Sequence, residues 1–178
     1  MDAFGPRSPG TVPQFLIRKA GVEDVPVIVR FIHALAEYER LSHECVATEE
    51  GVRSTVFGEP PAAEVALAEW EGIPVGMALF FPNYSTFLAK PGIYLEDLFV
   101  LPEYRGRGIG KALLLHVGRL ARDRGCGRFD WSVLDWNTPS IEFYRSLGAV
   151  PLADWTMMRV TGPALDRMAA MPMEPATR

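Results

Sequence analysis

The chain has 178 residues, of which 48% are hydrophobic, and its 18 basic and 22 acidic side chains give a formal net charge of −4. This length and composition predict a single domain with a substantial core and exclude a largely disordered chain. The sequence pI of about 5.4 argues against a nucleic-acid partner. No apolar run approaches the ~20 residues that cross a membrane, so no membrane association is expected.

Cysteine and histidine usage points away from disulfides and metals. Cys45 and Cys126 are far apart and form no CxxC pair, so neither a disulfide framework nor a zinc site is expected. A cytoplasmic location is the simplest interpretation of these isolated thiols. His33, His43 and His116 share no ligand spacing, and we therefore assign no metal.

The single domain is predicted over residues 15–170. Residues 1–14 (MDAFGPRSPGTVPQ) lack the apolar centre of a secretory signal and are predicted to form a disordered tail, while residues 171–178 are expected to fray. Between these tails the sequence contains no internal repeat, low-complexity tract or linker.

The domain is predicted to begin with a strand and a long helix. Residues 14–20 are a short apolar segment typical of a strand. Residues 22–41 have apolar side chains at helical spacing, and Pro26 fits near the helix start. The apolar stripe of this helix comprises Val25, Ile28, Val29, Ile32, Leu35 and Ala36.

A second helix and a hairpin are predicted next. Residues 48–58 are typical of a short helix that ends at Gly58. Residues 64–83 predict a β-hairpin, because Glu71 and Gly72 interrupt two apolar or alternating runs.

Strand–helix units are predicted for the second half. Residues 92–101 are an apolar strand, and residues 109–125 predict a helix ending at Gly125 with Leu113, Leu114, Val117, Leu120 and Ala121 facing inward. The remaining predicted elements are a strand over 127–134, a helix over 137–148 with Pro139 in its first turn and Gly148 at its end, a last strand over 155–160 and a short helix over 162–171. Antiparallel hairpins followed by strand–helix–strand units predict an α/β fold with one mixed sheet and helices on both faces.

A glycine-rich stretch, YRGRGIG at residues 104–110, joins an apolar strand to a helix start. Unpaired backbone N–H groups and the helix dipole attract anions at such a place, and glycines let the backbone fold closely around a phosphate. Arg105 and Arg107 add positive charge. The stretch therefore predicts a diphosphate cradle, and the alternative is a tight strand–helix turn with solvated arginines. It fits neither the P-loop nor the GxGxxG signature.

The spacing of Arg105, Gly108 and Gly110 resembles the coenzyme A pyrophosphate loop (R-x-x-G-x-G) of the GNAT acetyltransferase superfamily. The segments ALAEYER, YLEDLFVLPEYRGRGIGKALL, LDWNTPSIEFYRSLGA and WTMMRV are similar to the diamine (spermidine/spermine-type) and thialysine acetyltransferases. The resemblance extends from Phe15 to Leu165. It implies a sheet splayed in a V, with acetyl-CoA as cosubstrate between the fourth and fifth strands.

The resemblance also implies which residues contact acetyl-CoA. Leu98 and Val100 are expected to offer backbone groups to the pantetheine arm, and Asn137 a side-chain hydrogen bond, although Asn137 is also a good helix cap. For Arg145 a solvated position fits the sequence equally well. The expected contact set is Leu98, Phe99, Val100, Arg105, Gly106, Arg107, Gly108, Ile109, Gly110, Lys111, Asn137, Ser140, Tyr144 and Arg145.

Glu96 and Asp97 interrupt an apolar strand, where neighbouring side chains point to opposite faces. Burying both carboxylates is costly unless something compensates. One interpretation is structural, with one acid at a frayed edge and the other in a salt bridge. The resemblance instead implies that Glu96 is the general base for the substrate ammonium and that Asp97 holds the cation. The sequence leaves open which of the two faces the cleft.

Tyr144 lies in the helix predicted over residues 137–148, where a tyrosine is most often an ordinary amphipathic aromatic. The resemblance implies that it protonates the leaving thiolate of CoA. Phenol and thiol pKa values of ~10 and ~8.5 are close enough for this transfer.

The predicted function is N-acetyl transfer from acetyl-CoA to a primary amine of a small cationic acceptor such as a diamine, polyamine or lysine-like compound. Direct attack in a ternary complex is expected, because no cysteine lies in the motifs. The alternatives are a protein lysine or N-terminal acetyltransferase and a non-catalytic acyl-CoA-binding module. By resemblance the chain forms a homodimer, and the residues expected to bind the acceptor are Tyr38, Glu39, Glu96, Asp97 and Trp155.

The identity of the acceptor stays open at this point. Residues 83–92 and the stretch after Ala149 depart from the diamine enzymes, and both are expected to border the acceptor pocket.

Overall fold

The structure is a computed structural model that describes residues 14–173. The chain divides into two compact units, with the boundary between Ser132 and Val133. The tails predicted over residues 1–14 and 171–178 lie largely outside the described residues. The single domain over residues 15–170 stays a prediction.

The first unit contains a five-stranded mixed sheet in the order β1-β2-β3-β4-β5. β1 to β4 pair antiparallel, whereas β5 pairs parallel with β4. The hairpin of β2 and β3 forms as predicted, and Glu71 and Gly72 both have positive φ, at 51° and 80°. The strands are β1 (Phe15–Lys19), β2 (Glu64–Trp70), β3 (Ile73–Ser85), β4 (Lys90–Val100) and β5 (Arg128–Trp131).

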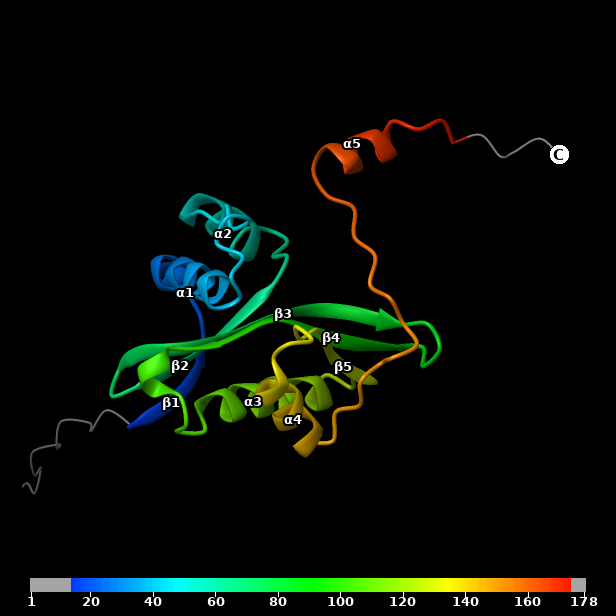
Figure 1. Ribbon diagram of the computed structural model, residues 1–178. Coiled ribbons are helices and arrows are strands. Elements are labelled where there is room, and N and C mark those ends of the chain that lie inside the picture. Colours follow the sequence, from blue (N-terminus) through cyan, green and yellow to red (C-terminus); the bar gives the residue numbers. More distant parts are fainter. Residues whose placement is uncertain (1–13, 174–178) are drawn as a thin grey trace, which may run out of the picture. The chain divides into compact units, whose positions relative to one another are not determined.

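Three α-helices cover this sheet, with α1 and α2 on one face and α3 on the other (Figure 1). Their bounds are α1 (Val25–Tyr38), α2 (Glu49–Val56) and α3 (Ile109–Asp123), with short 3-10 helices η1 (Val22–Asp24) and η2 (Pro102–Tyr104). The predicted α/β class, a mixed sheet with helices on both faces, is therefore confirmed. None of the helices within residues 14–173 is both long and apolar enough to cross a membrane.

The core under α1 follows from its apolar stripe. Val25 and Ile28 are fully buried, and so is Phe31, which the predicted stripe omits. The Phe31 ring lies 5.5 Å from that of Phe99, and this contact fixes α1 on β4. On α1, Ile32 and Leu35 are only half-buried.

α3 packs its predicted apolar face inward and ends where glycine allows. Leu113, Leu114, Val117 and Ala121 are buried, whereas Leu120 is only half-buried. Gly125 follows the helix with φ of 69°, the left-handed conformation that commonly ends a helix.

The second unit contains α4 (Thr138–Ser146) and α5 (Pro163–Ala169). The strand predicted over residues 155–160 is wrong, because that segment has no regular structure. A strand is held by hydrogen bonds to a neighbour, and no strand in the described part of the chain pairs with it. Its surroundings leave large apolar side chains exposed, namely Val150, Leu152, Trp155, Met157, Met158 and Val160.

Candidate functional site

One edge of β4 is only partly covered by a neighbouring strand. It pairs with β3 along its whole length, but β5 pairs only with residues 92–95. Along residues 96–100 the other edge of β4 has no strand partner within the described range. Such an edge presents backbone N–H and C=O groups to an extended ligand. Leu98, Phe99 and Val100, predicted to contact the cosubstrate, lie on this free edge.

A β-bulge lies where the free edge begins. Leu79 of β3 faces Asp97, whereas the next residue, Phe80, faces Leu95, so Glu96 is the extra residue. Leu79 belongs to the core beneath α1 and α2, which places Asp97 on the α1 face of the sheet. Glu96 is exposed. Asp97 therefore lies toward α1, and Glu96 is the exposed extra residue of the bulge beside it.

Three carboxylates act on one another at this bulge. Burial raises the pKa of the Asp97 carboxyl to about 6, and the negative charges of Glu96 and Glu39 contribute to the shift. Burial also raises the pKa of Glu39, which directly follows α1. The structure thus brings the predicted acceptor residues Glu39, Glu96 and Asp97 together as an acidic cluster, which a cation would stabilise.

Metal-ligating side chains were compared over the described residues. Across residues 14–173 there is no group of three or more His, Cys, Asp or Glu side chains arranged to hold a metal ion.

The glycine loop has the backbone geometry of a cradle. Gly106 and Gly108 have positive φ values of 76° and 78°, and Gly108 directly precedes α3. A Cβ atom built on either glycine would meet nothing within 4 Å, so the space beside the loop is open. No side chain caps α3, and the first N–H groups of a helix lie outside its own hydrogen-bond ladder. Ile109, Gly110 and the exposed Lys111 supply that first turn.

The two arginines of the loop stack on aromatic rings. The guanidinium of Arg105 lies 4.5 Å from the centre of the Tyr38 ring, and its Nε donates to the Val100 carbonyl oxygen at 3.0 Å. The guanidinium of Arg107 lies 5.1 Å from the ring centres of both Trp70 and Tyr104. Arg105 therefore links the loop to α1 and β4, a contact that no local sequence pattern indicates.

The other predicted site residues lie in the second unit. Asn137 Oδ1 accepts a hydrogen bond from the Ser140 backbone N–H at 3.4 Å, which caps α4. Tyr144 is half-buried, with its ring centre 5.3 Å from that of Phe143. Arg145 is exposed, and Trp155 is 75% exposed. That these residues and Glu96 belong to one site stays a prediction.

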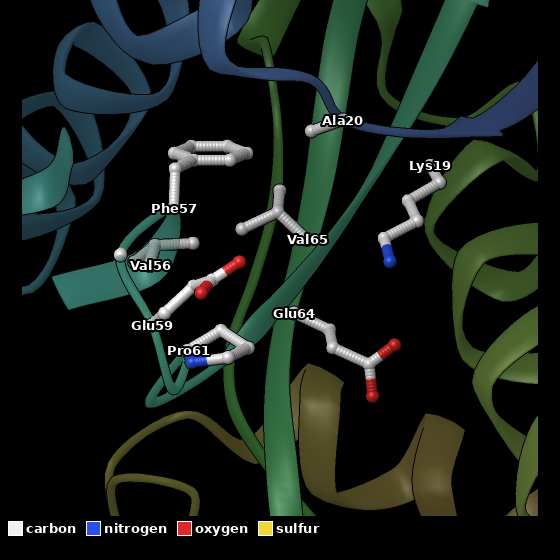
Figure 2. A pocket seen from close by; sticks show the side chains of 9 residues that line it. Lys19, Ala20, Val56, Phe57, Glu59, Pro61, Glu64 and Val65 are labelled. Carbon is white, nitrogen blue, oxygen red and sulfur yellow. The ribbon is translucent and has the colours of Figure 1, made fainter. Parts of the chain in front are cut away.

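A surface cavity of about 250 Å³ lies away from the acidic cluster. Figure 2 shows its apolar wall of Val56, Phe57 and Val65 and the side chains of Glu59 and Glu64. Arg124 holds Glu64 through two hydrogen bonds of 2.6 and 2.9 Å. The cavity shares no residue with the predicted site.

Known proteins match this chain over most of its length. The acetyltransferase (GNAT) family matches residues 30–149. The thialysine N-epsilon-acetyltransferase of Sus scrofa is 40% identical over 165 residues, which cover 86% of this chain and 96% of that protein. The L-ornithine N5-acetyltransferase of Arabidopsis thaliana is 37% identical over 194 residues, which cover 84% and 85%.

A solved structure has a similar fold. An integron cassette protein from the mobile metagenome of V. cholerae superposes with a TM-score of 0.76 at 25% identity, over 89% of this chain and 99% of that chain. The free edge of β4, the glycine loop before α3 and the sequence matches lead to one conclusion. The chain belongs to the GNAT family of acetyltransferases.

Proposed function

We propose that this acetyltransferase moves the acetyl group of acetyl-CoA to a primary amine of a small cationic acceptor. The observation that carries the proposal is the acidic cluster of Glu39, Glu96 and Asp97 at the β4 bulge, beside the free edge. A cation in the cluster would relieve the mutual repulsion of the carboxylates. The relatives named above are described as acting on ornithine and thialysine, which both carry an amine on a short chain.

The first unit has features that suit acetyl-CoA. The open space at Gly106 and Gly108 and the uncapped start of α3 suit a diphosphate. The free edge of β4 suits the pantetheine arm, whose amides can pair with it as an added strand does. A Cβ atom at Gly110 would lie 3.7 Å from a Val100 methyl group, so the start of α3 is close to the end of β4.

The proposed mechanism is direct attack in a ternary complex. Asp97, shielded from water, attracts the ammonium of the acceptor, since charges interact more strongly in a desolvated site. Glu96 takes the proton from the bound ammonium, and its exposure lets it pass that proton to water. The neutral amine attacks the thioester carbonyl, the C–S bond breaks, and Tyr144 protonates the departing thiolate. The amide nitrogen then loses its remaining extra proton through water, and Tyr144 regains a proton from solvent.

A panel of acceptors tests this proposal by CoA release. Diamines, polyamines, ornithine and thialysine should all be turned over faster than an amine of similar size with a net negative charge. Faster turnover of lysine-containing or N-terminal peptides would favour a protein acetyltransferase instead. Failure to release CoA with every amine would favour a non-catalytic acyl-CoA-binding module.

Gly108→Asp is expected to weaken acetyl-CoA binding about tenfold or more, which corresponds to roughly 1.4 kcal/mol. The substitution puts a carboxylate where the diphosphate is proposed to bind. Titration calorimetry measures the affinity. Gly125→Asp is the matched control, because Gly125 also has positive φ, at 69°, and open space, but follows the other end of α3. Equal affinities of the two variants, or unchanged affinity in a folded Gly108→Asp variant, would contradict the cradle.

We also propose a homodimer, supported by the exposed apolar side chains between Val150 and Val160. Exposed apolar patches of this kind favour association, and a second copy could supply the strand neighbour that residues 155–160 lack. Met158 is 86% exposed, and Met158→Glu should shift the protein toward monomer in analytical ultracentrifugation. Glu50→Gln, an exposed change on α2, is the control. A wild-type mass near 19.7 kDa at micromolar concentration would contradict the dimer.

A further inference from the structure

The first unit holds a thiol and an imidazole that the acetyl transfer does not use. His33 lies on α1, and Cys45 lies twelve residues later in the loop before α2. The Cys45 Sγ is 3.5 Å from the His33 Nδ1, a hydrogen-bond distance for sulfur. Cys45 is half-buried and His33 is exposed, so small molecules can reach the pair from solvent.

The second ring nitrogen of His33 fixes the tautomer. Its Nε2 lies 3.0 Å from the Ala47 carbonyl oxygen. A carbonyl oxygen only accepts, so Nε2 carries the hydrogen and Nδ1 of the neutral ring has the lone pair. The Cys45 thiol therefore donates to Nδ1. A nucleophile beside a base that a third group orients is the arrangement of an activated nucleophile.

We propose that Cys45 is a modification site, a nucleophilic thiol that exchanges with low-molecular-weight disulfides with His33 as its base. The Cys45 sulfur attacks one sulfur of the disulfide while its proton passes to His33 Nδ1. The S–S bond of the reagent breaks, and a mixed disulfide forms on Cys45. The leaving thiolate takes the proton back from the imidazolium. The disulfide is itself the oxidant, so the exchange needs no further reagent.

Cys126 is an internal control for this site. It is also half-buried and free. Its charged neighbour is the Arg124 guanidinium, which interacts electrostatically with Cys126 and is itself bound by Glu64 through two hydrogen bonds. The two cysteines thus share a burial class, and Cys45 has a neighbouring base where Cys126 has a cation that is paired with a carboxylate.

The experiment treats the full chain with oxidised glutathione at pH 7 and follows both cysteines by mass spectrometry of quenched, digested samples. An ordinary thiol is only a few per cent ionised at this pH, so a positioned base should make Cys45 react about tenfold faster than Cys126. His33→Gln keeps an N–H donor for Ala47 and removes the base. It should slow Cys45 about tenfold and leave Cys126 unchanged.

Three results would overturn the proposal. They are equal rates at the two cysteines, a faster reaction at Cys126, and a Cys45 rate that His33→Gln leaves unchanged. The comparison of Cys45 with Cys126 is made within one wild-type chain, so it decides the matter even if the His33 variant does not fold.

Discussion

Tyr144→Phe is expected to lower the rate of acetyl transfer by about 10²–10⁴-fold at neutral pH, the usual contribution of a positioned acid. The substitution removes only the phenolic oxygen, so CoA would have to leave as an unprotonated thiolate. Single-turnover measurements record the transfer before CoA is released, so a slow release step cannot hide the loss. The acceptor in this experiment is the best amine of the panel.

The controls for Tyr144 separate acid catalysis from packing. The ring contact between Tyr144 and Phe143 does not need the phenolic oxygen, so Tyr144→Phe should keep this contact and remain folded. Its melting temperature and acetyl-CoA affinity are measured beside the transfer rate. Phe143→Leu alters the same ring pair and keeps the phenol, so its transfer rate should fall much less. A loss of only a few-fold in Tyr144→Phe would assign that side chain to packing.

Glu96→Gln is expected to lower kcat/KM by about 10²–10⁴-fold near pH 7 and far less near pH 10. Glutamine keeps the size and hydrogen bonding of the side chain but cannot take a proton. An alkylamine with a pKa of ~10.4 is nearly all protonated at neutral pH, and the free amine becomes abundant only as the pH approaches that value. The pH–rate profiles of variant and wild type, with one acceptor, provide the measurement.

Asp97→Asn is the matched variant at the next position. Since burial raises the pKa of Asp97 to about 6, its carboxyl is ionised at pH 7 and above, and its loss there should raise KM by a constant factor. In the wild type the acceptor KM should fall as the pH rises through about 6, and the variant should lack this change. The two roles would have to be exchanged if kcat/KM of Asp97→Asn fell strongly near pH 7 and little near pH 10, while the profile of Glu96→Gln ran parallel to that of the wild type.

The ionised carboxylate of Asp97 is expected to favour acceptor binding but to lower the stability of the fold. A carboxyl whose folded-state pKa is raised from 3.8 to about 6 lowers the stability as the pH rises through that window, and the full loss persists above it. Asp97→Asn should therefore raise the free energy of unfolding at pH 7 by up to about 3 kcal/mol. Higher stability with weaker acceptor binding would show that Asp97 is kept for function at a cost to the fold.

Several features could be predicted from the sequence because they depend on residues close together in the chain. The apolar stripes of α1 and α3 follow from helical spacing, and the turn at Glu71 and Gly72 follows from a glycine between two strand patterns. The cap at Asn137 is equally local. The glycine loop before α3, together with the segments ALAEYER, LDWNTPSIEFYRSLGA and WTMMRV, resembles the GNAT family, and the family match confirms this resemblance.

Other features were decided only by contacts between distant parts of the chain. The bulge at Glu96 depends on the register of β4 against β3. It leaves Glu96 without a partner on β3 and puts Leu95 and Asp97 on opposite faces, whereas strict alternation would put these two residues on the same face. The stacking of Arg105 on Tyr38 and the Cys45–His33 pair join segments that no periodicity relates. The failed strand over residues 155–160 has the same cause. A strand pattern describes one segment, whereas a strand exists only when a second segment satisfies its backbone hydrogen bonds.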